Sequence, residues 1–128
     1  MKKLKKKLIT FTMVTCMALT SIPVWAGTTT FDVSKGSYTG IAKKVDAGSY
    51  YTVTYHLYGN KVASKMSCQV VWTTVNGSVS KSVVDKKVNS NDLKGSKSNG
   101  PKSGYKSANV IYSVTYNGQT KQSSANAF

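Results

Sequence analysis

The sequence predicts an all-β protein, a small antiparallel β-sandwich of six or seven strands that follows a cleaved signal peptide. Apolar and polar residues alternate with period two in several segments, which is typical of half-buried strands. Asn-Gly pairs follow two of these segments, where hairpin turns would fall. No sustained period of 3.6 residues appears, and the Tyr-, Val-, Thr- and Ser-rich composition disfavours a helical bundle. An immunoglobulin-like or jelly-roll-like sandwich and a partly open barrel both fit this pattern.

Residues 1–26 have the features of a secretory signal peptide. Five lysines within Lys2–Lys7 precede an apolar run, Leu8–Leu19, that is too short to span a bilayer. Small or permitted residues lead up to a cleavage site after Ala26. A lipoprotein signal at Cys16 fits less well, because no small residue precedes that cysteine. We therefore expect a secreted, extracellular bacterial protein whose mature chain is a single domain without a transmembrane segment.

The mature chain, residues 27–128, is strongly cationic. All 18 basic residues of the 128-residue sequence are lysines and all four acidic residues are aspartates, which gives a formal charge of +14. Five lysines lie in the signal segment, so the mature chain keeps 13 lysines against four aspartates, a formal charge of +9. Cys68 is its only cysteine, so the domain has no internal disulfide and depends on its hydrophobic core. About 100 residues are enough to build one.

The first strands are expected at Thr29–Val33 and around Tyr38–Val45. The next segment has apolar residues at odd positions, Tyr51–Leu57, and a later one has them at even positions, Met66–Trp72. Gly59-Asn60 lies between these two segments as a weak turn signal. The alternation predicts that each of these strands buries one face.

The last strands form a hairpin around Asn117-Gly118. Apolar residues occupy the even positions of Ala108–Tyr116, and both residues of an Asn-Gly turn accept the positive φ that such a turn needs. A two-residue turn would place large residues opposite small ones on one face, which supports this register. The expected pairs are Tyr112 with Ser123, Val110 with Ala125 and Ala108 with Ala127.

A second hairpin is expected at Asn76-Gly77. A two-residue turn there would pair Val70 with Val83 and Cys68 with Asp85, and it would also set Trp72 opposite Lys81. The pairs that involve Asp85 and Lys81 are less favourable, so a bulge near Val83-Val84 is expected to shift the face.

Residues 89–104 differ from the rest of the chain. Ser, Gly, Asn and Lys dominate this segment, and it contains Pro101. We expect a long polar loop, and loops of this length within compact domains are either functional or disordered.

The mature chain offers little for catalysis or metal binding. His56 is expected on the outward face of its strand and Cys68 on the apolar face of another, so the two cannot form a catalytic pair. A buried thiol in apolar surroundings is unreactive. The aspartates Asp85 and Asp92 lie beside lysines, an unfavourable setting for calcium. We expect no enzyme activity, no catalytic residue, no cofactor and no metal.

The lysines of the polar segment are the candidate binding residues. A cationic loop would attract polyanions such as anionic cell-surface polymers, glycans or lipid headgroups. Sequence-specific nucleic-acid binding is not expected, because Arg, which gives bidentate contacts, is absent. Such lysines can also be ordinary solvated surface or reflect a biased genome composition. The candidate set is Lys86, Lys87, Lys94, Lys97, Lys102 and Lys106.

Tyrosines form the second candidate site. Tyr50 and Tyr58 fall on the outward face of the segment that carries His56, where the three rings could stack on sugars. Burial at a sandwich edge would explain them equally well. The favoured function is therefore a secreted, non-enzymatic, cationic protein that associates with anionic cell-envelope polymers or glycans. The alternatives are an exported antimicrobial, bacteriocin-like protein that acts on membranes, and a subunit of an extracellular assembly, with the oligomeric state left open.

Overall fold

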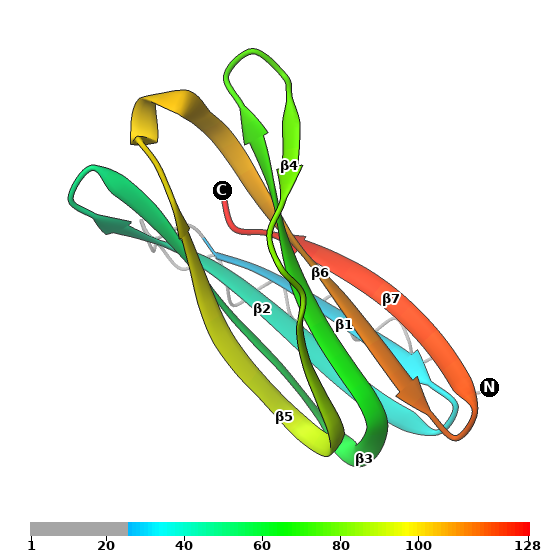
Figure 1. The fold of residues 1–128 in the computed structure, drawn as a ribbon. Coiled ribbons are helices and arrows are strands. Elements are labelled where there is room, and N and C mark those ends of the chain that lie inside the picture. Colours follow the sequence, from blue (N-terminus) through cyan, green and yellow to red (C-terminus); the bar gives the residue numbers. More distant parts are fainter. Residues whose placement is uncertain (1–25) are drawn as a thin grey trace.

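The computed structural model describes residues 26–128, which form seven antiparallel strands and one short 3₁₀ turn (Figure 1). The expected signal peptide, apart from Ala26, lies outside the described residues. The elements in chain order are β1 (Ala26–Val33), β2 (Gly36–Ala47), β3 (Tyr50–Thr74), β4 (Val79–Lys81), β5 (Asp85–Asn99), η1 (Lys102–Gly104), β6 (Tyr105–Tyr116) and β7 (Gln119–Asn126).

The long strand β3 organises the sheet. Its first half pairs with β2 and its second half with β6, so that the sheet runs in the order β1-β2-β3-β6-β7. The strands β4 and β5 also pair with β3, and β5 follows both of its halves. Figure 1 shows β3 and β5 bending together, which folds the sheet over and brings β1 near β7. There Thr29 Oγ1 lies 2.5 Å from Ser123 Oγ, and the sheet is nearly closed as a barrel.

The interior is filled by the apolar face of each strand. Alternate residues of β3 and β6 are buried, in agreement with the period-two pattern of the sequence. All buried residues of the described chain are apolar, tyrosine, tryptophan or cysteine. The largest fully buried side chains are Trp72, Tyr38, Tyr112, Leu57 and Met66.

The hairpin at Asn117-Gly118 has the predicted register. Val110 pairs with Ala125 and Tyr112 with Ser123, and the N–H of Ala127 donates to the carbonyl of Ala108. Asn117 and Gly118 have φ values of 54° and 77°, the left-handed conformation that favours Asn and Gly.

The hairpin at Asn76-Gly77 differs from the prediction by one residue. Trp72 pairs with Ser80 and not with Lys81, because only Gly77 of the turn has a positive φ, so the loop is longer than a two-residue turn. The chain then leaves the ladder between β4 and β5, around the expected bulge at Val83-Val84. This break adds one residue and restores the expected pairing of Cys68 with Asp85.

Gly59-Asn60 is not a turn between two strands. The segments expected as separate strands are the halves of β3, which continues through this point with a register shift against β5 between Tyr58 and Ala63. Gly59 permits a close approach here, because a Cβ atom on it would lie 2.2 Å from the Tyr38 ring. The glycine therefore bends the strand and does not end it.

The expected long loop over residues 89–104 is wrong for most of its length. Residues up to Asn99 belong to β5 and pair with β3, with Leu93 buried opposite Leu57. The strand borders the sheet, so the backbone hydrogen bonds to β3 hold it in place while most of its side chains remain polar. Only residues 100–104, which include η1, connect β5 to β6.

Candidate binding face

Three outward residues of β3 were predicted to form an aromatic platform, and the structure brings the rings of two of them together. The rings of His56 and Tyr58 lie 4.7 Å apart at an interplanar angle of 41°, and Tyr58 is exposed. Tyr50 lies six residues before His56, roughly 20 Å away along an extended strand. Its ring lies against Gly100 at the other end of the strand. Tyr50 is therefore not part of the His56–Tyr58 pair.

A shallow groove lies beside this pair, on the outer face of β2, β3 and β5. Strand register explains its composition, because His56 pairs with Ile41 on one side and with Lys94 on the other, while Thr54 pairs with Lys43. Two lysines from strands on either side of β3 thus face the same groove. We call this site the cationic groove; it is lined by Ile41, Lys43, Thr54, Tyr55, His56, Lys94, Gly95 and Ser96.

Asp92 lies beside the groove, where it forms a hydrogen bond with His56. His56 Nε2 lies 2.5 Å from Asp92 Oδ1, and this hydrogen bond, more than the nearby lysines, keeps the pKa of Asp92 below its usual value. Neither Lys43 nor Lys94 makes an ion pair with an aspartate anywhere in residues 26–128. Both lysine charges are therefore available to a bound anion.

The six candidate lysines of the sequence do not form one patch. Lys94 lies in the cationic groove, whereas Lys86 and Lys87 lie on the first half of β5 and Lys106 is exposed near the start of β6. Lys97 and Lys102 are bound to aspartates: Lys97 Nζ is 3.0 Å from Asp85 Oδ1, and Lys102 Nζ is 3.6 Å from Asp46 Oδ1.

Lys97 belongs to a polar cluster at the barrel wall. It pairs across the ladder with the buried Val53, which directs it toward the interior side of β5. The hydroxyl of Tyr55 donates a hydrogen bond to Asp85 Oδ2, and burial is the main cause that raises the pKa of Tyr55. This hydrogen bond and that from Lys97 outweigh burial and lower the pKa of Asp85. We call Tyr55, Asp85 and Lys97 the seam cluster, because they join the two halves of β5.

Cys68 lies next to the seam cluster, opposite Asp85 in the ladder. It is fully buried, and burial, with a smaller contribution from Asp85, raises the pKa of its thiol to about 12. The thiol therefore stays protonated at neutral pH and is a poor nucleophile. It points to the interior, whereas His56 points outward, as the alternation predicts.

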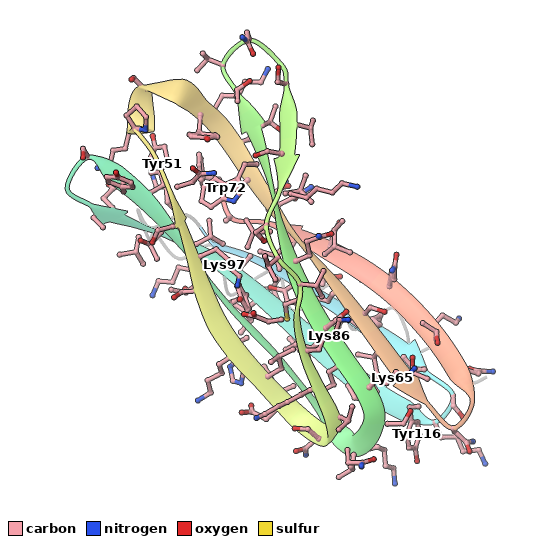
Figure 2. The ribbon with its side chains drawn as sticks, in the orientation of Figure 1. Tyr51, Lys65, Trp72, Lys86, Lys97 and Tyr116 are labelled. Atoms are coloured by element: carbon pink, nitrogen blue, oxygen red, sulfur yellow. The ribbon has the colours of Figure 1, made fainter. Side chains whose placement is uncertain are left out.

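The end of the barrel near Trp72 is closed by aromatic rings (Figure 2). Tyr51 packs against Phe128 with centroids 4.5 Å apart, and Trp72 meets Tyr105 edge-on at 5.6 Å. Two lysines cover these rings from outside: the Nζ atoms of Lys44 and Lys102 lie 5.3 and 5.6 Å from the centre of the Tyr51 ring. Asp46 contacts both lysines. Lys102 thus lies over the Tyr51 ring and pairs with Asp46 at this end of the barrel.

Sequence reasoning missed Lys43 in the groove and the contact that Asp92 makes beside the groove. Lys43 could have been found, because the alternation in Tyr38–Val45 places it on the outward face of that strand. Asp92 could not, because its contact with His56 joins residues 36 positions apart that the sequence placed in a strand and in a loop.

No three His, Cys or Asp side chains come close enough to hold a metal ion within residues 26–128. The same part of the chain has no helix long and apolar enough to cross a membrane. Comparison with known proteins gives no significant match to a family model, a curated protein or a solved structure.

Proposed function

We propose that this protein is a secreted, non-enzymatic, cationic β protein that associates with anionic cell-envelope polymers or glycans through the cationic groove. The observation that carries the proposal is the convergence of Lys43 and Lys94, from strands on either side of β3, on one face beside His56 and Tyr58.

The groove provides the two interactions that an anionic glycan polymer needs. Each lysine near an anionic surface contributes on the order of 1 kcal/mol, so two lysines together with the net positive charge of the chain give attraction that salt screens. The adjacent rings of Tyr58 and His56 give an apolar surface against which a sugar ring can stack. Lysine acts as a point charge, which suits the repeated anionic groups of a polymer better than it suits one planar anion that needs a bidentate contact.

Co-sedimentation with bacterial envelope fragments, titrated with salt, tests the proposal. The unmodified protein is expected to bind at low salt and to be released as salt approaches about 0.5 M. The Lys43→Gln/Lys94→Gln variant should bind about 30-fold more weakly, because roughly 1 kcal/mol is lost for each lysine. Tyr58→Ala should weaken binding at low salt and leave its dependence on salt unchanged, because the ring carries no charge.

A matched control separates the groove from net charge. Lys35→Gln/Lys121→Gln removes the same charge from exposed sites at the β1–β2 turn and on β7. If the control variant loses as much binding as the groove variant, the attraction belongs to the whole molecule and the groove assignment is wrong. Absence of binding at every salt concentration contradicts the proposed function itself, and dye release from anionic vesicles would favour the membrane-active alternative.

A further inference from the structure

The strands β4 and β5 form an open edge of the sheet. Among the described residues, both pair only with β3, so the other side of each strand makes no ladder hydrogen bonds. The opposite ends of the sheet differ, because β1 and β7 contact each other through side chains such as Thr29 and Ser123. An unpaired strand presents N–H and C=O groups that another extended chain can pair with.

The side chains of this edge are apolar and cationic. Val79, Val83 and Val88 are 58%, 76% and 65% exposed, which is unusual for three valines within ten residues. Lys81 and Lys86 project from the same strands. We call residues 79–90 the β4–β5 edge.

Strand register places apolar and cationic side chains of the edge on one outer face. Val79 and Lys81 lie opposite Thr73 and Val71, and Lys86 and Val88 lie opposite Ser67 and Lys65, which are outward positions of β3. Figure 2 shows Lys65 and Lys86 over these neighbouring strands. The outward side chains of the edge, in chain order, are therefore those of Val79, Lys81, Lys86 and Val88.

From these observations we infer that the β4–β5 edge binds an extended acidic segment of another protein, which carries acidic and apolar side chains on the same face, by adding it as a further strand. The segment would pair its backbone with the free edge, pack its apolar residues on the exposed valines and place its carboxylates near Lys81 and Lys86. This surface is separate from the cationic groove, and the inference does not depend on the proposed function.

Charge explains why a second copy of this chain is the wrong occupant. Antiparallel pairing of two such edges would bring lysines of one copy beside lysines of the other, and like charges opposite each other destabilise strand pairing. Lysines on an edge strand are a common means by which proteins prevent self-association. An acidic strand turns the same lysines into attractive contacts.

A synthetic peptide tests the inference on the unmodified protein. The probe is the capped heptapeptide Val-Thr-Glu-Thr-Glu-Thr-Val, in which the valines and glutamates share one face of a strand. The readout is backbone amide hydrogen exchange together with a binding titration. We expect slower exchange confined to residues 79–90 and affinity that falls with salt. One control peptide replaces Glu with Gln, and a second carries N-methyl groups on all of its central residues, which removes the donors of both peptide edges. Both controls should bind at least tenfold more weakly.

Protein variants check the location. Lys81→Glu/Lys86→Glu should reduce the affinity for the peptide at least tenfold, whereas Lys35→Glu/Lys121→Glu makes the same charge change away from the edge and should reduce it less. The inference is overturned if the peptide slows no exchange or slows it elsewhere. Equal binding of the Gln or N-methyl peptide also overturns it. So does amide exchange of residues 79–90 that becomes slower as the protein concentration rises in the absence of peptide, because this would show that two copies of the chain pair through the edge.

Discussion

Asp85 joins β3 and the two halves of β5 through its two carboxylate oxygens. It accepts hydrogen bonds from Tyr55 on β3 and from Lys97 on the second half of β5, while its own backbone begins β5. We expect Asp85→Asn to lower the free energy of unfolding by about 1–2 kcal/mol, because charge-assisted hydrogen bonds are stronger than neutral ones. Urea unfolding measures the change. Asp46→Asn is the matched control; its carboxylate is 59% exposed, and loss of its ion pairs should cost less than about 1 kcal/mol.

The pH dependence of this effect follows from the lowered pKa of Asp85. The folded state keeps this carboxylate ionised at a pH at which the unfolded chain already binds a proton, so the stabilisation is fully present above the unfolded pKa of about 3.9. It is lost as the pH falls through the lower pKa of the folded state. The difference in stability between the unmodified protein and Asp85→Asn should therefore be constant from about pH 8 to pH 5 and shrink below about pH 4. If the difference in stability between the two proteins stays constant throughout an acid titration, the charge of Asp85 does not stabilise the fold.

At the scale of elements, Gly40 determines how closely β2 packs against β6. A Cβ atom at this position would lie 2.5 Å from the ring of Tyr112, which is fully buried and donates its hydroxyl to the carbonyl of Ile41. We expect Gly40→Ala to destabilise the protein by about 1–3 kcal/mol, because a buried ring would have to move within a packed core. Gly104→Ala is the control, since nothing lies within 4 Å of its added methyl group. Thermal unfolding of both variants should show a lower Tm for Gly40→Ala only.

The elements that sequence predicts well are those fixed by local patterns. The hairpin of β6 and β7 follows from alternation and from the Asn117-Gly118 turn, and its register was correct. Residues 89–99 of β5 were taken for part of a loop because their polar composition carries no period-two signal. Only pairing with β3, through contacts such as Leu57 with Leu93, makes them a strand. The cationic groove depends on that pairing between β3 and β5. Alternation within β3 was enough to predict that His56 and Tyr58 point outward, but the contact of His56 with Asp92 on β5 could not be predicted from it.

The excess of lysines acts on the whole molecule. Residues 27–128 carry 13 lysines and four aspartates, and three of those aspartates, Asp46, Asp85 and Asp92, contact lysine or histidine side chains in the structure. Most lysines therefore repel one another in the folded state, and this repulsion relaxes when the chain expands. Lys65 and Lys86, on neighbouring strands, illustrate such a pair.

Salt should therefore stabilise the protein. Raising sodium chloride from about 0.01 to 0.15 M shortens the screening length from roughly 30 to 8 Å, which weakens repulsion between distant lysines more than the short Lys97–Asp85 contact. We expect a gain of about 1 kcal/mol, or roughly 4–8 °C in Tm for a domain of this size. Thermal unfolding at a series of salt concentrations measures it, and Lys65→Gln/Lys86→Gln should give a smaller salt effect. A Tm that falls as salt rises would mean that the ion pairs contribute more than the repulsion, and the lysines would then stabilise the fold as a network.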